Sequence, residues 1–256
     1  MLFIFDIGGV VTNTFEMESL CKDLNLTSKD FYKICKYKNF NIWEDYQLGN
    51  ICTNDFWATF NIIIKEIKKL SLKKQKKVIQ NYDFSQTLDF SKIPEVTTDL
   101  FRMHFHPSRK KLTVELIEKL KEKHRVVCGT NTIQSHWENH LECGDYAFFN
   151  QTYPSNKIAR IKPNVDFFET ILKAENYSPE EAFFTDDKIE NCEAAAKLGI
   201  KVHHFTSEEK LFEEWSKYIF SNFRWYGITV IDHLNMNPLT IIYMRTHLNL
   251  PVTVVL

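Results

Sequence analysis

The chain has 256 residues, which is enough for one large α/β domain or for one domain that carries an insertion. Hydrophobic residues make up 44% and charged residues 25% of the chain, and its formal net charge is −1. This composition is typical of soluble globular proteins and gives no electrostatic argument for a nucleic-acid or membrane partner. The six cysteines form no CxxC pair and Asp6 interrupts the apolar start, so we expect reduced thiols, no signal peptide and a cytoplasmic location.

The first predicted element is a buried parallel strand at residues 2–5. Its sequence, Leu-Phe-Ile-Phe, is a short apolar run that ends at Asp6, and two glycines at positions 8 and 9 then favour a turn. From about residue 15 to residue 105, helical periodicity dominates and strand-like runs bounded by turns are absent. The chain therefore begins with one strand and continues into a long helical block.

One helix of this block has apolar residues at helical spacing from Phe56 to Leu70, with Thr53 or Asn54 as its candidate N-cap. The run from residue 65 to residue 77 contains seven lysines. We interpret this run as a solvated helix face, and a nucleic-acid site there is the weaker alternative.

From about Pro107 onwards, predicted strands and helices alternate. We predict helices at residues 109–123, 165–176 and 190–198, a short helix that starts at Ser178, and strands at residues 125–129, 147–149, 182–185 and 201–205. Such alternation implies an α/β fold of the Rossmann-like, doubly wound type, in which helices cover both faces of a parallel sheet.

This scheme divides the chain into three parts. Residues 1–14 and 106–220 form the α/β core, and residues 15–105 are a small helical domain inserted after the first strand. Residues 221–256 form a C-terminal extension of unknown role, whose strand-like runs at 228–231 and 252–256 have no place in the sheet. The sequence gives no oligomeric state.

Polar residues follow several of the predicted strands. They are Asp6 after the first strand, Thr130 and Asn131 after the second, Lys162 at a helix start, and Asp186 with Asp187 after a later strand. Ligands of open α/β sheets bind beyond the carboxyl ends of the strands, so we expect these side chains to meet there.

Three carboxylates, a hydroxyl and an ammonium group suit phosphoryl transfer to a carboxylate. Asp6 is the candidate nucleophile, and a metal would offset the repulsion between it and a phosphate. Mg²⁺ prefers hard oxygen ligands, which makes Asp6 and Asp186 the natural pair and Asp187 a further ligand, direct or through water. Thr130 and Lys162 can bind the remaining phosphoryl oxygens.

The ordered motifs resemble those of the haloacid dehalogenase superfamily, in subfamily I with its small helical cap. The motifs are Phe5-Asp6-Ile7-Gly8-Gly9-Val10, Thr130-Asn131, Lys162-Pro163 and Asp186-Asp187, and the resemblance covers about residues 1–220. The closest likeness is to the branch that includes bacterial α-glucose-1-phosphate phosphatases, because the segments at residues 43–51 and 124–132 are similar to that branch's cap signature and second motif.

The resemblance implies a role for each motif. Asp6 would be the nucleophile, the Gly8 carbonyl would join the aspartates as a metal ligand, and Asn131 would join Thr130 and Lys162 in binding the substrate. It further implies Mg²⁺ as cofactor and a small phosphorylated metabolite as substrate. One position departs from the pattern: most phosphatases of the superfamily carry a second aspartate two residues after the nucleophile, as general acid and base, and this chain has Gly8 there.

Three functions remain open at this stage. The first is a phosphatase that acts through an aspartyl-phosphate on Asp6. The second is a metal-independent 2-haloacid dehalogenase-type hydrolase, which the Asp186-Asp187 pair disfavours. The third is a non-catalytic binding protein on the same scaffold. Trp43 and Tyr46 are candidates for substrate contact or core packing, and His104 and His106 for reaching the cleft from the domain junction.

Overall fold

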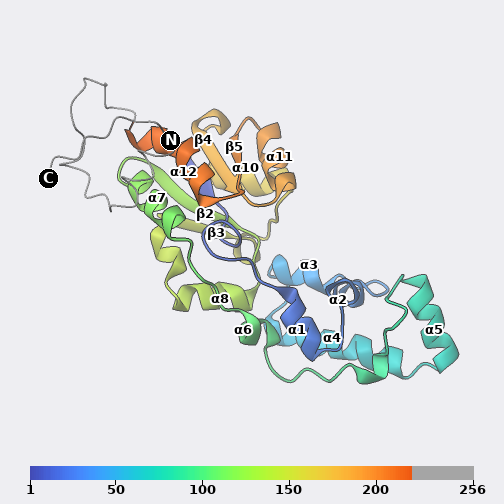
Figure 1. Cartoon of the computed structure of the whole chain (residues 1–256). Helices are drawn as coiled ribbons and strands as arrows, with labels where there is room; N and C mark the ends of the chain where they lie inside the picture. Colours follow the sequence, from blue (N-terminus) through green and yellow to red (C-terminus); the bar gives the residue numbers. More distant parts are fainter. Residues whose placement is uncertain (221–256) are drawn as a thin grey trace.

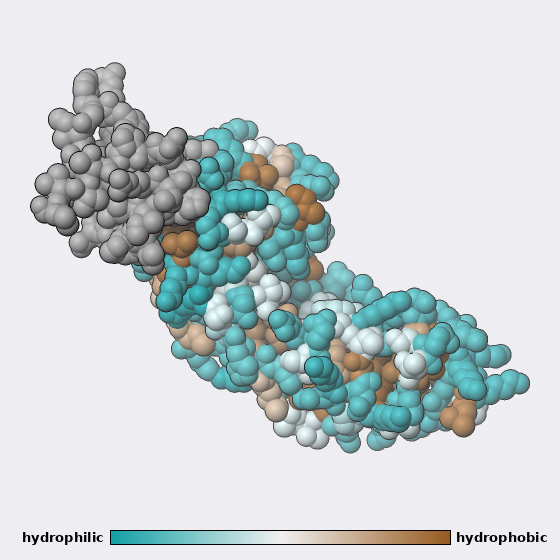
Figure 2. Space-filling view, in the orientation of Figure 1, coloured by the Kyte–Doolittle hydropathy of each residue, from teal (hydrophilic) through white to brown (hydrophobic). Residues whose placement is uncertain are grey.

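The computed structural model describes residues 1–220, apart from four side chains near the end of the last helix. The predicted strand-like runs at 228–231 and 252–256 lie outside the described residues, as does the whole C-terminal extension. Two lobes are visible in Figure 1, one built on a sheet and one made of helices. In the described residues no helix is both long and apolar enough to cross a membrane. Hydrophilic side chains cover most of the visible face of both lobes in Figure 2.

The sheet lobe contains five parallel strands in the order β3-β2-β1-β4-β5, with the first strand at the centre. The strands are β1 (Leu2–Phe5), β2 (Arg125–Thr130), β3 (Gln151–Pro154), β4 (Ala182–Asp186) and β5 (Lys201–His204). Every pairing is parallel, which confirms the predicted sheet.

The central strand is apolar at every position because both of its faces are covered. Phe3 and Phe5 pack on one side of the sheet against α7 (Lys111–Lys121) and α12 (Glu208–Phe220). Leu2 and Ile4 pack on the other side against α10 (Val165–Glu175) and α11 (Ile189–Lys197). Alternate side chains of a strand point to opposite faces, so this run produces the doubly wound architecture that we predicted.

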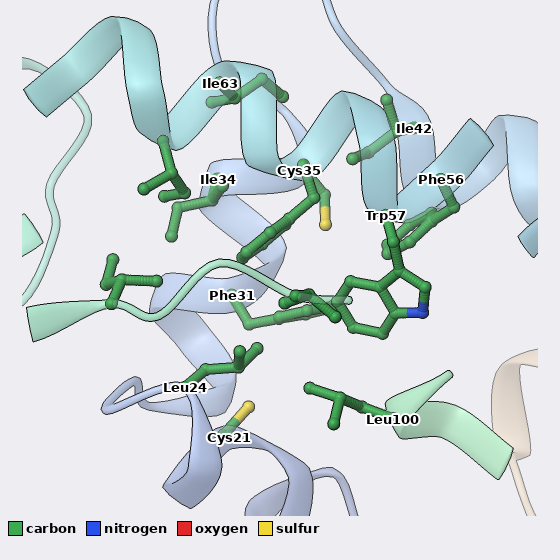
Figure 3. Packing of buried hydrophobic residues seen from close by; sticks show 14 of the residues in the cluster. Cys21, Leu24, Phe31, Ile34, Cys35, Ile42, Phe56, Trp57, Ile63 and Leu100 are labelled. Carbon is green, nitrogen blue, oxygen red and sulfur yellow. The ribbon is translucent and has the colours of Figure 1, made fainter. Parts of the chain in front are cut away.

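The helical lobe has its own hydrophobic core. Its helices are α1 (Met17–Asp23), α2 (Ser28–Cys35), α3 (Ile42–Gln47), α4 (Thr53–Lys68), α5 (Leu72–Asn81) and α6 (Leu100–His104), with a short 3-10 turn, η1 (Phe90–Lys92). Figure 3 shows Phe31, Phe56 and Trp57 pointing into one cluster between α2 and α4. The helix α5 buries no residue and lies at the end of the lobe farthest from the sheet (Figure 1).

Two linkers join the lobes, and they run side by side. Asn13 N donates to Ser108 O at 3.0 Å, and Lys110 N donates to Val11 O at 2.8 Å. Thr12 also forms an isolated antiparallel bridge with Arg109. The chain therefore leaves the sheet lobe and returns to it at one place.

Two sequence predictions about single elements are wrong. Residues 147–149 are not a strand: Gly144 turns the chain with φ +72°, and η2 (Asp145–Phe148) follows as a 3-10 helix that buries Tyr146. The third strand is β3 instead, an edge strand with an exposed start and no apolar run. The N-cap of α4 is Cys52 rather than Thr53 or Asn54, because Cys52 Sγ accepts from the Asp55 backbone at 3.5 Å and Thr53 is already the first helical residue.

The remaining helices of the sheet lobe connect or flank the strands. They are α8 (Gln134–Glu142), α9 (Ser155–Ile158) and the 3-10 turn η3 (Pro179–Glu181). The capping box at Ser178 and Glu181 confirms the helix start predicted there, whereas α8, α9 and α12 were not predicted.

Candidate active site

The parallel sheet brings three polar positions together because β1 lies between β2 and β4. Phe5 pairs with Cys128 on one side and with Thr185 on the other, so the carboxyl ends of the three strands are level. Asp6 follows directly, and its backbone N–H donates to Thr185 O at 2.9 Å. This register places Asp6, Thr130 and Asp186 together at the carboxyl ends of the strands, the carboxyl edge of the sheet, as predicted from their positions in the sequence.

The carboxylates of Asp6, Asp186 and Asp187 form a cluster at this edge. One oxygen from each lies within 4.8 Å of the others. Asp186 is fully buried and Asp6 is 8% exposed, whereas Asp187 is half-buried. Three like charges this close in a site with little water repel one another unless a cation compensates them.

Lys162 supplies the positive charge inside the cluster. Its ammonium nitrogen lies 3.0 Å from Asp6 Oδ1 and 2.6 Å from Asp186 Oδ2, and it donates to Gly129 O at 2.9 Å. The residue is only 3% exposed. Burial opposes its charge, but the two carboxylates outweigh burial and raise the pKa of Lys162, so it stays protonated.

For Asp6, the candidate nucleophile, the surroundings disfavour the charged form. Burial raises the pKa of Asp6 to about 6, against the lowering effect of Lys162, and the charges of Asp186 and Asp187 add to the increase. One ammonium among three carboxylates leaves the cluster short of positive charge. The electrostatics therefore favour an additional cation.

Two buried carboxylate oxygens at the cluster have few partners. Asp187 Oδ1 accepts no hydrogen bond within the described residues, and Asp6 Oδ1 is paired with the Lys162 ammonium at 3.0 Å. Carboxylate oxygens of this kind are the ligands that Mg²⁺ prefers, and one or two of them commonly hold it beside a phosphate. The residues present therefore fit a divalent metal, with Asp6, Asp186 and Asp187 as the side chains that could bind it.

The loops around the cluster are held by side chain to backbone hydrogen bonds. Asn131 Nδ2 donates to Lys162 O at 2.8 Å, and Lys162 N donates to Asn131 Oδ1 at 2.8 Å. The Asn131 amide thus positions Lys162, a use that differs from the substrate contact we expected. Thr130 is 2% exposed, and its hydroxyl is 3.4 Å from Asn131 O, a long bond that a phosphate oxygen could replace.

Asn191 also contributes to the site, although we did not predict it from the sequence. Asp186 Oδ1 accepts from Asn191 Nδ2 at 2.9 Å and from the Lys188 backbone at 2.8 Å. These bonds leave Asp186 Oδ2 for Lys162 and fix the direction of the carboxylate. The signal in the sequence is an asparagine five residues after the aspartate, in the first turn of α11.

The two glycines after Asp6 have different roles. A Cβ built on Gly8 would meet nothing within 4 Å, so there is open space for a side chain at this position. Gly9 has φ +85°, and a Cβ there would lie 2.6 Å from Asp187 Cγ. Gly9 is therefore required for the close approach of the loop to Asp187, whereas Gly8 tolerates a side chain.

The other candidate residues lie elsewhere. His104 is held in the helical lobe by Ser19 at 2.9 Å and by Asp23 at 2.8 Å. Trp43 packs against Phe101 with ring centroids 5.8 Å apart, and Tyr46 is fully buried. Trp43 thus contributes to the packing of the lobe, and the hydroxyl of the buried Tyr46 reaches the sheet lobe, 2.8 Å from Ser135 Oγ.

Comparison with known proteins gives the family. A family model described as haloacid dehalogenase-like hydrolase matches residues 3–205. The chain belongs to the haloacid dehalogenase-like hydrolases. This result confirms the resemblance inferred from the four motifs at the level of the superfamily.

Solved structures of haloacid dehalogenase-like proteins have the same fold. A predicted HAD-like family hydrolase from Porphyromonas gingivalis has a TM-score of 0.59 at 17% identity, over 85% of this chain and 97% of that chain. A HAD family enzyme from Bacteroides thetaiotaomicron, in complex with magnesium and inorganic phosphate, has a TM-score of 0.56 at 20% identity, over 80% of this chain and 93% of that chain. At these identities the likeness concerns the fold.

Proposed function

We propose that this protein is a Mg²⁺-dependent phosphatase that hydrolyses a small phosphorylated metabolite through an aspartyl-phosphate on Asp6. The observation that carries the proposal is the cluster of Asp6, Asp186 and Asp187 around Lys162 at the carboxyl edge of the sheet. The magnesium and phosphate in the Bacteroides thetaiotaomicron relative support it. We further propose that residues 15–105 act as a cap over this edge.

In the first chemical step a carboxylate oxygen of Asp6 attacks phosphorus. A phosphorus–oxygen bond forms, the bond to the leaving group breaks, and the leaving oxygen takes up a proton. In the second step water attacks the aspartyl-phosphate, which releases inorganic phosphate and restores the Asp6 carboxylate. Lys162 and Thr130 would bind the phosphoryl oxygens as negative charge develops on them.

The proposed metal ligands are Asp6, Asp186, Asp187 and the Gly8 carbonyl. When bound there, Mg²⁺ would neutralise phosphate charge and allow an anionic nucleophile to approach. The raised pKa of Asp6, about 6 without a metal, is consistent with a site that needs a cation to keep this carboxylate ionised.

The open space at Gly8 bears on the choice of substrate. With no aspartate at position 8, two residues after Asp6, to protonate the leaving oxygen, a substrate whose leaving group carries negative charge easily would react faster. Anomeric sugar phosphates are of this kind, which agrees with the sequence likeness to α-glucose-1-phosphate phosphatases. A sugar phosphate is therefore our first candidate substrate.

The decisive experiment is a panel of phosphorylated metabolites and aryl phosphates, assayed with and without Mg²⁺ on the full chain. We expect phosphate release that requires Mg²⁺ and that falls as the pKa of the leaving group rises. Metal-independent release of halide from a 2-haloacid would support the dehalogenase alternative instead. No turnover of any compound, with Mg²⁺ binding intact, would contradict catalysis and favour a binding protein.

A further inference from the structure

The helix α5 is held against the rest of the helical lobe by one face. Its Val78 and Ile79 are partly buried and pack on the hydrophobic core of the lobe. Gln75 Nε2, on the same face, donates to Leu70 O at 2.9 Å. The opposite face is exposed to solvent and carries Lys73, Lys76 and Lys77. Because the last two lie three and four residues after the first, their ammonium groups point to one side of the helix.

Six exposed lysines at the end of α4 and on α5 have no acidic partner. We call this group the basic tip, and its members are Lys65, Lys69, Lys73, Lys74, Lys76 and Lys77. Within residues 1–220 no salt bridge includes any of them. The nearest carboxylates along the chain are already paired, Glu66 with Lys38 at 3.1 Å and Asp83 with Lys33 at 2.6 Å. The net charge of −1 for the whole chain thus averages over a local excess of positive charge.

Two exposed aliphatic side chains stand among these lysines. Leu72, the first residue of α5, is 77% exposed and precedes Lys76 by four residues. Ile62 on α4 is 53% exposed and precedes Lys65 by three residues and Lys69 by seven. These spacings put each aliphatic side chain on the same side of its helix as the lysines named with it. The surface therefore combines positive charge with apolar groups that no other part of residues 1–220 covers.

This combination suits an anionic lipid surface better than a nucleic acid. A lysine near an anionic membrane contributes about 1 kcal/mol, which is about fivefold in affinity, and clusters of such residues on an amphipathic helix are typical of lipid-binding surfaces. Aliphatic side chains beside them can enter the boundary between headgroups and acyl chains. Nucleic-acid sites instead favour the planar guanidinium of arginine and aromatic rings on which bases stack, and residues 61–81 contain neither.

We propose that the basic tip binds this protein reversibly to membranes that contain anionic phospholipids. The ammonium groups would contact the lipid phosphates and carboxylates, and Leu72 and Ile62 would enter the headgroup region. Since α5 lies at the end of the helical lobe farthest from the sheet, the aspartate cluster stays away from the bilayer in this arrangement (Figure 1). The inference holds whether or not the protein is a phosphatase, because it concerns a different surface.

Cosedimentation of the full chain with vesicles tests the proposal. We expect binding to vesicles of phosphatidylcholine with about 30% phosphatidylserine, and at least tenfold weaker binding to pure phosphatidylcholine. Raising the sodium chloride concentration from about 0.1 M to about 1 M shortens the screening length from about 10 Å to about 3 Å, so it should release most of the bound protein.

A matched pair of triple variants separates the basic tip from charge in general. The tip variant combines Lys73→Gln, Lys76→Gln and Lys77→Gln, and at about fivefold for each lysine it should bind anionic vesicles about a hundredfold more weakly. The control variant removes the same charge from exposed lysines of the sheet lobe by combining Lys111→Gln, Lys173→Gln and Lys197→Gln, and it should bind within about threefold of the wild type. Leu72→Ser should weaken binding several-fold at either salt concentration.

The melting temperature of both triple variants should match the wild type, because all six side chains are exposed. Hydrolysis of p-nitrophenyl phosphate should also be the same in all three proteins. Equal loss of vesicle binding in the tip and control variants, or no binding of the wild type to anionic vesicles, would overturn the inference. Binding of a single-stranded RNA oligonucleotide that the tip variant loses, without binding to vesicles, would overturn the lipid assignment in favour of nucleic acid.

Discussion

The sheet lobe and the helical lobe bury different kinds of side chain. Among the described residues 15–105, the one buried charged or polar side chain is Asp30, which is bound by Ser85 and Thr27. The sheet lobe buries Asp6, Lys162 and Asp186 within one ion cluster. Buried charges lower stability unless they are well paired, so they mark where a fold has been shaped for chemistry. The aromatic core of the helical lobe contains no such ion cluster among the described residues.

Asp6→Asn should give the largest effect on activity and almost none on the fold. The amide keeps the size of the carboxylate but is a poor nucleophile, so we expect kcat to fall by about 10⁴-fold or more. The melting temperature should stay the same or rise, because a buried charge is removed. Asp23→Asn, on the exposed surface of the helical lobe, is the matched control for both measurements. Residual activity above a few per cent in the pure variant would rule out Asp6 as nucleophile.

Lys162→Met should damage both activity and stability. It leaves the Asp6 and Asp186 carboxylates buried without their cation, which typically costs about 3–5 kcal/mol of unfolding free energy. Urea unfolding without metal measures the loss. Lys188→Met is the control, because Lys188 is exposed and contacts Asp186 through its backbone. A loss below 1 kcal/mol would mean that Lys162 does not balance these charges.

Phe60→Ala should lower stability and leave activity nearly unchanged, which is the opposite of the effect expected for Asp6→Asn. Phe60 is fully buried in the helical lobe, with its ring stacked on Phe31 at 5.5 Å between centroids. Its truncation should cost about 3–5 kcal/mol through lost packing and a cavity. The value of kcat on p-nitrophenyl phosphate should stay within about threefold of the wild type at a temperature where the variant is folded. Phe60→Leu should lose less stability. A fall in the kcat of Phe60→Ala as large as that of Asp6→Asn would contradict the view that the Phe60 side chain contributes to packing and not to catalysis.

The smallest expected effect is a pH dependence of stability that comes from His136, at the junction of the lobes. The His136 ring stacks on Phe105 with centroids 4.0 Å apart, and its Nε2 is buried without a hydrogen bond. Burial, with a minor contribution from His140, lowers the pKa of His136 from 6.5 to about 3. Because the folded value lies below the unfolded value, the unfolded chain takes up the proton first, and stability falls as the pH drops from 6.5 towards 3.

The size of this effect follows from the same linkage. We expect a loss of about 1–2 kcal/mol between pH 7 and pH 5, after allowance for partial exposure of the ring. His136→Phe should remove this part of the pH dependence in urea unfolding, whereas His106→Phe, on an exposed residue, should leave it unchanged. Equal pH slopes in the wild type and His136→Phe would show that the ring does not carry the effect.

The sequence predicted the structure best where a fully buried strand ends at a polar residue. Leu2–Phe5 is apolar throughout because it is covered on both faces, and its end at Asp6 could be predicted for that reason. The edge strand β3 has no such signal, since it is covered less and starts with the exposed Gln151. The helix α8 was missed because its buried residues are Ser135 and His140, which give no apolar periodicity.

Within the site, side chains after strand ends were predictable and their supporting contacts were not. The roles of Asn131 and Asn191 depend on which loop lies opposite, which no local pattern in the sequence encodes. The same holds for the buried Asp145, which binds Arg109 Nε and His140 Nδ1, each at 2.7 Å. Arg109 precedes Asp145 by 36 residues, and only the folded chain brings the two together.

The paired linkers at Asn13 and Ser108 have an evolutionary consequence. Because residues 11–13 and 108–110 are hydrogen-bonded to each other, the sheet can form whatever segment is inserted between them. Doubling the length of such an insert costs only about 0.6 kcal/mol in loop-closure entropy. A lineage can therefore exchange, lengthen or shorten this module by recombination at two adjacent points while the ionised groups beyond β1 and β4 keep their positions. The inserted lobe and the charged cluster can in this way diverge at separate rates within one gene.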